Sequence, residues 1–359
     1  MRAGIIDSEV NDIWQVAHDS GTDIDGDSSY TITGLDGNAD IEYRLITYYV
    51  QSIDSLLTLT FNSDTGANYG TQYIFGTNTT PSSLRYTGHP NLRVNQSVSG
   101  SSGTICFGDT HIFAKSGEIR TALNINAGSI SGTTVPRITK NGFVWNNSAD
   151  NITQMVLAAS SGTMLSGTRL ILLKKVHNDG MKTGTLTPNK IKGAWERIYD
   201  STLSSAATSV TISDLEGDTD CLYRLVTRGI SGYAGSAFIQ IQPNADATTS
   251  NYGYQSLRGD STTASAARAT TYDGILCGYS TAITRLFFSD VLLYAKSGYE
   301  RTALSNIVNN ITGTTVLQIN LTGGVWDNTA DEITSLRLIS SQADGLGIGT
   351  HLELYRLNL

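Results

Sequence analysis

Residues that could carry out catalysis are few and scattered along the sequence. The five histidines, the side chains best suited to general-base or metal chemistry near neutral pH, form no HxH or HExxH pattern; they are His18, His89, His111, His177 and His351. None recurs at the matching place in the other half of the chain. The sequence also has no GxSxG nucleophile elbow, Walker A lysine loop or GxGxxG turn opening a helix. It therefore predicts no catalytic residue and no enzyme. The enzymatic alternative is a polysaccharide-cleaving sandwich, which needs two facing carboxylates.

Clusters of acids and glycines could bind ions, yet each has a simpler interpretation. Asp23–Asp27 resembles the start of an EF-hand loop, but position twelve is Gly34 instead of Glu. Asp36–Asp40 is typical of a turn that enters a strand, with a calcium loop as the alternative. Gly345–Gly349 precedes a strand and favours a hairpin turn over a phosphate cradle, and the integrin-type tripeptide Arg258–Asp260 is common by chance. We predict no metal-binding residue and no cofactor.

Aromatic residues could instead contact a sugar. Trp145 and Trp326 each stand just before a polar turn, where a tryptophan can anchor the core or offer a stacking platform. The segments Asn62–Tyr69 and Asn244–Tyr252 each follow an alternating strand. Their Asn and Asp side chains favour a loop closed by internal hydrogen bonds around a packed Tyr, with a ligand-contacting loop as the alternative.

The elements that must position these residues come in two copies. Trp14 and Trp195 lie 181 positions apart, and so do Trp145 and Trp326. Longer segments recur at the same spacing: Ala114–Leu123 as Ala295–Leu304, Ile130–Val135 as Ile311–Val316, and Trp145–Thr153 as Trp326–Thr334. Two copies at this period indicate two homologous domains, because a solenoid repeats every ~20–50 residues.

Alternating apolar and polar residues predict strands within each copy. Leu57–Phe61, Phe238–Gln242 and His351–Leu357 show the period of two that is typical of half-buried strands. The segment Ser116–Asn124 is ambiguous between helix and strand. We expect roughly eight or nine strands per copy, and an all-β fold of two tandem homologous antiparallel β-sandwich domains of jelly-roll type.

The domain boundaries follow from the repeat. We expect copy one over residues 1–176, a polar linker with Gly and Pro over residues 177–193, and copy two over residues 194–359. A sandwich of ~175 residues buries about 70% of its unfolded surface, so each copy should fold alone without metal or disulfide. A cut in the linker should then leave two soluble, folded halves.

Composition excludes several classes of protein. The 24 Lys and Arg against 32 Asp and Glu give a net charge of −8, which disfavours a protein that wraps nucleic acid. No apolar run approaches the ~20 residues of a transmembrane helix, and Met1–Glu9 is not expected to be a secretory signal. The odd, widely spaced cysteines, Cys106, Cys221 and Cys277, predict neither a disulfide framework nor a zinc site. We therefore expect synthesis in a reducing compartment.

Several segments resemble β-rich virion proteins of tailed bacteriophages. They are Gly34–Tyr43, Pro243–Tyr252 and the close of each copy, which in copy two runs Trp326–Leu336 and Gly349–Tyr355. This close is similar to the W-x-N-T-A-D-x-I-T…G-T/S-x-x-x-L-Y ending of phage structural jelly rolls. Copy one departs in its last strand, where Leu172–Lys175 replaces the Leu-Tyr ending. The resemblance implies a jelly-roll fold and a structural role in the virion, and it carries no catalytic residue.

We therefore expect a non-enzymatic virion structural protein, in the first place a capsid decoration or accessory head protein. Its partners would be other virion proteins and further copies of itself, without nucleic acid or membrane insertion, and it would be made in the host cytoplasm. The alternative is a tail- or fibre-associated protein that binds host glycans, which 17 Tyr and 4 Trp would suit. Because matched residues reflect the shared fold, we expect function where the copies differ, in the loops around Tyr69–Gly103 and Tyr252–Tyr279.

Overall fold

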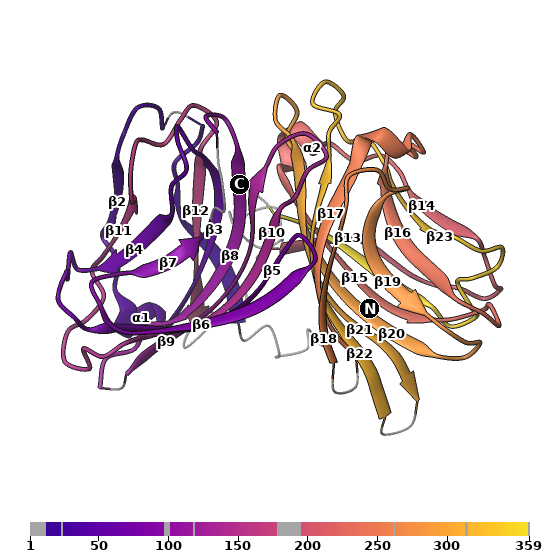
Figure 1. Cartoon of the computed structure of the whole chain (residues 1–359), viewed down its shortest axis with the longest axis horizontal. Coiled ribbons are helices and arrows are strands. Elements are labelled where there is room, and N and C mark those ends of the chain that lie inside the picture. The colour runs from indigo at the N-terminus through magenta and orange to yellow at the C-terminus, as the bar shows by residue number, and fades with distance from the viewer. Residues whose placement is uncertain are drawn as a thin grey trace, which may run out of the picture.

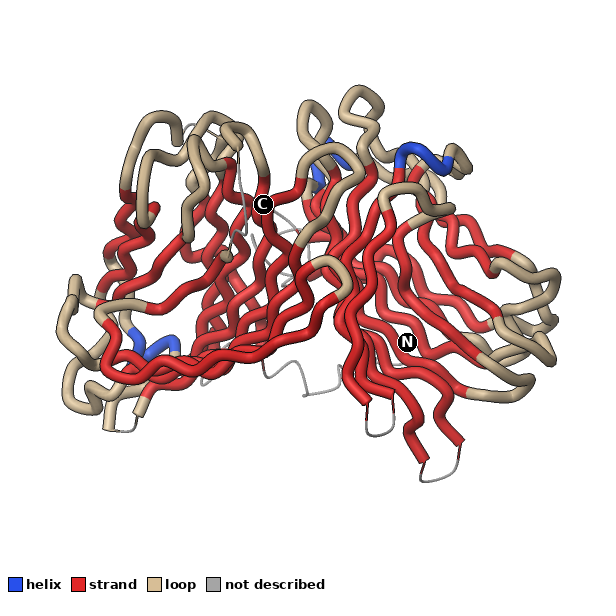
Figure 2. The backbone as a smooth tube through the Cα atoms, in the orientation of Figure 1, coloured by secondary structure: helices blue, strands red, loops and turns tan. Residues whose placement is uncertain are grey.

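The structure, a computed structural model, describes residues 12–22, 24–96, 101–117, 119–177, 195–260, 263–312 and 315–357. Strands make up nearly all of its regular structure, and the helices are short single turns (Figure 2). No helix in the described part of the chain is long and apolar enough to cross a membrane. The strands form four antiparallel sheets, two from each copy, which confirms the predicted all-β, tandem sandwich fold.

The first copy pairs one wide sheet with one narrow sheet. The wide sheet has eight strands in the order β1 (Asp12–Asp19), β12 (Arg169–His177), β3 (Glu42–Val50), β8 (Ile105–Phe113), β9 (Arg120–Ile130), β10 (Arg137–Trp145), β5 (Tyr69–Thr77) and β6 (Thr80–His89). The narrow sheet has four, in the order β2 (Ser29–Thr33), β11 (Gln154–Ala159), β4 (Leu57–Phe61) and β7 (Leu92–Asn95). A helical turn, α1 (Gly37–Asp40), leads into β3.

The second copy repeats this arrangement strand for strand. Its wide sheet has the order β13 (Trp195–Thr202), β24 (His351–Leu357), β15 (Leu222–Ile230), β20 (Leu286–Tyr294), β21 (Arg301–Thr312), β22 (Thr315–Trp326), β17 (Tyr252–Asp260) and β18 (Thr263–Ala269). Its narrow sheet has the order β14 (Ser209–Ile212), β23 (Leu336–Ser340), β16 (Ala237–Pro243) and β19 (Ile275–Ser280). The turn α2 (Gly217–Asp220) precedes β15, and a 3₁₀ turn, η2 (Thr249–Asn251), precedes β17.

Each copy has twelve strands, so the expected eight or nine was too low. The strands that the pattern missed are short or polar. The strand β7 has only four residues, and β6 is exposed along most of its length because it forms the edge of its sheet. The ambiguous segment Ser116–Asn124 proves to lead into a strand, since β9 begins at Arg120. Alternation identifies half-buried strands and passes over edge strands that carry polar residues on both faces.

Each sandwich encloses its own core between its wide and narrow sheets. In the first copy, Leu57, Leu59 and Phe61 of β4 point into a buried cluster that also holds Trp145. In the second copy, Ile239 and Ile241 of β16 occupy the matching place beside Trp326. The alternation that predicted these strands therefore reports the residues that face the two inner cores.

A third buried hydrophobic cluster joins the two copies. It contains Ile46, Tyr48 and Phe107 from the first copy and Leu292 and Tyr294 from the second. The rings of Tyr48 and Tyr294 stack with their centroids 4.3 Å apart. Figure 1 shows the two copies side by side, the first in indigo to magenta and the second in orange to yellow. The outer faces of the two wide sheets therefore pack against each other, so that both faces of these sheets are buried at this place.

The backbones of the two copies approach closely at this shared cluster. A Cβ on Gly253 of β17 would overlap the carbonyl oxygen of Thr133, and one on Gly323 of β22 would lie 2.5 Å from the Cβ of Ala127. A hydrogen bond also crosses between the copies, from the Tyr48 hydroxyl to the Glu300 carbonyl (3.1 Å). Glycine is required at such positions because any side chain would push the sheets apart.

The predicted linker, residues 177–193, lies outside the described residues apart from His177. The sheets on either side of it are complete without residues from the other copy. Separate cores support the expectation that each copy can fold alone. A separated copy would, however, expose apolar residues of the shared cluster, such as Ile46 or Leu292. An exposed apolar patch of this kind promotes association.

Candidate functional site

The paired tryptophans anchor the cores. Trp145 and Trp326 are 1% and 0% exposed, so no sugar can stack on them. The indole Nε1 of Trp145 donates to Asp64 Oδ2 (2.7 Å), and that of Trp326 donates to Asp246 Oδ2 (2.8 Å). This confirms the structural interpretation of both residues, because a buried indole N–H needs a hydrogen-bond acceptor.

The loops that follow β4 and β16 close on themselves. Asp64 also accepts hydrogen bonds from Gly66 N (2.8 Å) and Asn68 Nδ2 (2.9 Å), and Asp246 accepts equivalent bonds in copy two. Although partial burial acts to raise the pKa of Asp64, these bonds and the one from Trp145 hold it below its usual range. The interpretation as internally bonded loops around a buried Tyr69 is confirmed, and the carboxylates are already used by the fold.

The acidic turn Asp36–Asp40 is also occupied by its own neighbours. Asp36 caps α1 by accepting from the backbone N–H groups of Asn38 and Ala39. Asp40 accepts from the hydroxyl of Tyr43 (2.8 Å) and pairs with Lys174 Nζ (3.0 Å). These contacts confirm a turn that enters a strand and leave no group of free carboxylate oxygens for calcium.

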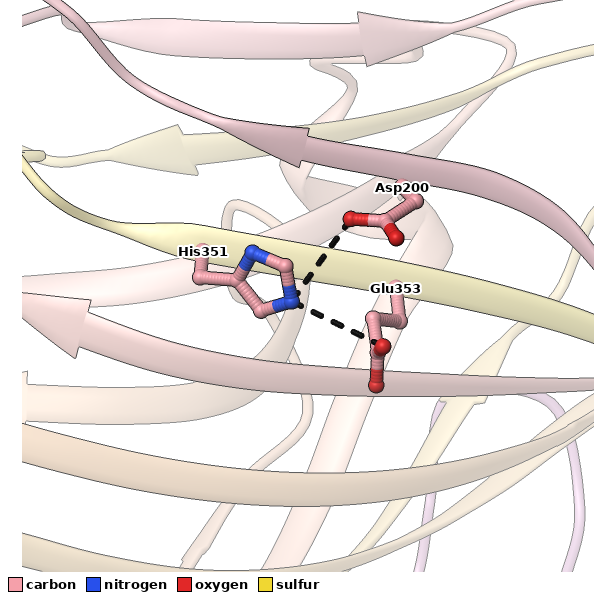
Figure 3. Close-up of side chains that lie close together, drawn as sticks. All are labelled: Asp200, His351 and Glu353. Carbon is pink, nitrogen blue, oxygen red and sulfur yellow. Dashed lines mark ion pairs between the residues drawn. The ribbon is translucent and has the colours of Figure 1, made fainter. Parts of the chain in front are cut away.

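One cluster, absent from the sequence analysis, combines side chains that could hold a metal ion. His351 Nε2 lies 3.7 Å from Asp200 Oδ1 and 3.6 Å from Glu353 Oε1 on neighbouring strands β24 and β13 (Figure 3). However, Arg197 Nη1 lies 2.8 Å from Asp200 Oδ2 and 3.0 Å from Glu353 Oε1. The guanidinium group supplies the positive charge that these carboxylates need. The cluster is therefore a surface ion-pair network.

The remaining residues singled out in the sequence are dispersed. His18 bonds to the hydroxyl of Tyr30 (2.9 Å), while His111 bonds to Glu42 (2.8 Å). Arg258 pairs with Asp260 within β17, so this tripeptide lies in a strand and not at a loop tip. Gly345–Gly349 lies in the loop between β23 and β24, which belong to different sheets, so the expected hairpin does not form. Residue Asp23 of the EF-hand-like segment lies outside the described residues, and the three cysteines are buried and unpaired.

A surface with unusual charge lies on the first copy, within the region where the copies differ. The wide sheet is twice as broad as the narrow one, so β5 and β6 extend past β7, the last strand of the narrow sheet (Figure 1). Five side chains gather there, from β5, β6, β7 and β10, and we call them the arginine ledge: Tyr73, Phe75, Tyr86, Arg93 and Arg137. Arg93 lies 4.3 Å from the ring centroid of Tyr86, and Arg137 lies 4.0 Å from that of Phe75.

The arginine ledge has no acidic partner. No salt bridge within the described residues involves Arg93 or Arg137. A hydrogen bond joins the hydroxyls of Tyr73 and Tyr86. This bond and the two arginines lower the pKa of Tyr86. Burial and the same bond raise the pKa of Tyr73 to about 12. The range Tyr69–Gly103, expected to be a functional loop, consists mostly of the strands β5, β6 and β7, so the expectation of a loop was wrong. The sequence analysis singled out neither arginine. Comparison of the copies could have found them, since copy two lacks both.

A second surface lies between the two wide sheets. It is a groove of about 600 Å³ lined mainly by apolar side chains, among them Ile74 of β5, Leu257 of β17, Phe288 of β20 and Ile319 of β22. Three of these are unusually exposed for their type, Ile74 at 46%, Phe288 at 43% and Ile319 at 57%. The groove continues the shared cluster outward, so it belongs to the contact between the copies.

No protein-family model and no curated protein matches the sequence. Among solved structures, the chain is similar to domains LG4-5 of the mouse laminin alpha1 chain, at 10% identity and a TM-score of 0.21, over 95% of this chain and 90% of that one. It is similar to the LG1-3 region of the laminin alpha2 chain at 8% identity and a TM-score of 0.21, over 90% and 63%. It is also similar to the PBSX exported protein XepA at 7% identity and a TM-score of 0.17, over 96% and 86%. The fold of this chain is a tandem pair of antiparallel, jelly-roll-like β-sandwiches.

Proposed function

We propose that the chain is a non-enzymatic structural protein of a bacteriophage particle, a decoration or accessory head protein that binds other virion proteins. The observation that carries the proposal is the buried cluster shared by the two copies. It holds two homologous sandwiches in one body, so that their outer surfaces keep a fixed spacing. The phage-like ending of each copy supports the same function.

The relation between the copies suits a symmetric target. Equivalent strands meet across the boundary, β5 with β17 and β6 with β18, as expected of an approximate two-fold axis. A body of this kind can contact two symmetry-related subunits of a shell at once. Binding at two linked points raises the overall affinity without any new contact, which is the advantage of fusing two copies in one chain.

The chemistry of the repeated acidic residues supports a non-enzymatic function. Asp64, Asp246 and Asp40 each bind groups of their own sandwich. A glycosidase needs one carboxyl group kept protonated and a second one facing it across a substrate cleft. The carboxylates that recur in both copies are engaged in the fold and do not serve that role.

A second candidate function is a tail- or fibre-associated protein that binds glycans of the host. The arginine ledge favours it, because it gathers aromatic and cationic side chains at one edge of the first sandwich, and copy two carries neither arginine. In this case the virion would still be the final location, but the contact of interest would be with the cell envelope.

Sedimentation with undecorated capsids tests the proposal. We expect the purified protein to pellet with capsids and to saturate at a fixed number of copies per capsid. Only capsids with free sites should bind it. Capsids already saturated with the protein are the control. Binding to host envelope alone would favour the second function, and binding to neither bait would contradict both.

A further inference from the structure

We propose that the arginine ledge is a binding site for an acidic oligosaccharide, a sugar chain with carboxylate or sulfate groups, held by Arg93 and Arg137. The site belongs to the first copy alone. The inference does not depend on capsid binding, because a ligand site of this kind can be present on either class of protein considered above.

The position of Arg137 is the first argument. Its side chain is only 8% exposed, and its guanidinium group lies over the ring of Phe75. Its one polar contact in the described chain is from Nε to Thr139 Oγ1 (3.3 Å), which leaves the terminal nitrogens without a carboxylate. Burying a cation without a counter-ion is costly, and an anion bound here would remove that cost.

Arg93 adds a second positive charge at the same place. It lies on the edge strand β7 and reaches the ring of Tyr86 across the gap between the sheets, where its Nη1 contacts the Tyr86 hydroxyl (3.3 Å). Burial lowers the pKa of Arg137 and the nearby charge of Arg93 acts in the same direction, while the hydroxyls of Tyr73 and Tyr86 act against them. The groups that offset the charge of Arg137 are therefore phenols and not carboxylates. The whole chain carries a net charge of −8, so this local excess is not a general property of its surface.

Comparison of the copies shows that the fold does not require these residues. The strand registers place Leu276 at the position of Arg93, and Gln318 at the position of Arg137. Tyr73 and Tyr86 correspond to Ser256 and Ala269. Phe75, the fifth ledge residue, corresponds to Arg258, which pairs with Asp260 in the same strand. The second sandwich forms the same sheets without a charge or aromatic ring at the other four positions. A purely structural role would be expected in both copies.

The chemistry of the ledge selects the class of ligand. A guanidinium group held over an aromatic ring has paired N–H donors whose spacing matches a carboxylate or a sulfate. The surface follows β6, whose exposed side chains along the ledge include Leu84 at 45%. An exposed edge strand of ten residues beside the two arginines can take an extended chain with separated charges. A densely charged nucleic acid would be repelled by the acidic remainder of the protein.

Calorimetric titration of the full chain tests the inference. The probes are an oligogalacturonate, a sulfated glucan oligosaccharide, a neutral malto-oligosaccharide of the same length and inorganic sulfate. We expect the two acidic oligosaccharides to bind at least about tenfold more tightly than the neutral one, a difference of about 1.4 kcal/mol. The affinity should fall with added salt, because charge contributes to binding.

Two variants identify the site. Arg93→Leu with Arg137→Gln gives the first copy the residues that the second copy already carries, so the sheets should remain intact, which the melting temperature checks. We expect the affinity of this double variant for the acidic oligosaccharides to fall by at least about tenfold. Arg85→Gln is the matched control, because Arg85 is exposed on the same strand and alternation places it on the opposite face from Tyr86.

Three results would overturn the inference. They are equal binding of acidic and neutral chains, binding that the double variant retains, and absence of binding to any oligosaccharide. Sulfate that binds as tightly as the sulfated chain would show an adventitious ion only, and would overturn the oligosaccharide as the ligand. None of these outcomes bears on sedimentation with capsids, so the two proposals can fail separately.

Discussion

Glu300 is a titratable side chain buried at the boundary between the copies. Its Oε1 accepts a hydrogen bond from the backbone N–H of Gly132 (2.6 Å), and its Oε2 is buried with no hydrogen-bond partner in the described chain. Burial raises the pKa of Glu300 to about 7, and the carboxylate of Asp327 adds to this effect. The protonated acid is therefore the form that suits the closed boundary.

This pKa predicts how stability depends on pH. The carboxyl group has an ordinary pKa of 4.5, so its raised value stabilises the folded protein fully below about pH 4.5, and this contribution is lost as the pH rises to about 7. Glu300→Gln should remove this loss, so that the difference in unfolding free energy between the two proteins changes by about 3 kcal/mol across that range. Denaturant unfolding at a series of pH values measures it. If the unfolding free energies of the two proteins changed with pH in parallel, the raised pKa of Glu300 would be contradicted.

The aspartate beneath each core tryptophan gives a second prediction for a single residue. Asp64→Ala removes the acceptor of the Trp145 indole and opens the loop closed by Gly66 and Asn68. We expect a loss of about 2–4 kcal/mol in the unfolding free energy, because a buried N–H would be left without a partner. Chemical denaturation measures it, with the exposed Asp27→Ala as control. An equal effect of both substitutions would show that the indole contact is unimportant.

At the scale of the strands, two equivalent glycines differ in their surroundings. Gly142 and Gly323 lie 181 positions apart on β10 and β22, yet only Gly323 faces the other copy. A Cβ on Gly323 would lie 2.5 Å from the Cβ of Ala127, while one on Gly142 would meet no atom within 4 Å. The same substitution at the two positions therefore separates the effect on the boundary from the effect on a strand.

We expect Gly323→Val to lower the unfolding free energy by about 1–3 kcal/mol more than Gly142→Val, because the larger side chain must displace the opposing sheet. Thermal unfolding of both variants measures the difference. Increased binding of a hydrophobic dye by Gly323→Val alone would indicate that the shared cluster has opened. If both variants were equally stable, the sheets could not be in contact at this place.

The extent to which strands could be predicted from the sequence depended on their burial. Strands such as β4 and β16 alternate apolar residues that face a core with mostly polar residues on the other face, and this alternation correctly predicts a strand. Most of the polar residues are also buried. β3 and β12 contain runs of consecutive apolar residues, as in Leu170–Leu173, because both of their faces are buried. Such runs of apolar residues indicate a strand that is buried on both faces, and they could have predicted the contact between the copies.

The candidate site was harder to predict than the fold. Arg93 and Arg137 stand far apart in the sequence, on a narrow-sheet strand and a wide-sheet strand, and no spacing rule links them. Only the packing of two sheets brings them to the same surface. The difference between the copies points to the range Tyr69–Gly103, which contains four of the five ledge residues, but these lie on strands and not in the expected loop.

For the whole molecule, the shared cluster predicts that the two copies stay associated after a cut in the linker. Each copy has its own core, so each should remain folded. The cluster between them buries Tyr48, Leu292 and other apolar residues, and this contact should survive without a covalent link. Two cut halves should therefore stay together, whereas the sequence alone suggested two separate soluble domains.

The most direct test of one fused body is the size of the protein after a single cut. A protease site introduced between Pro188 and Asn189 would allow cleavage of the folded chain, followed by analytical ultracentrifugation without denaturant. We predict one species near the intact mass of 38.4 kDa, and its separation into halves only when Gly323→Val is added. Two independent species of about half that mass, from the cleaved protein without that substitution, would contradict the shared core and the proposed function that depends on it.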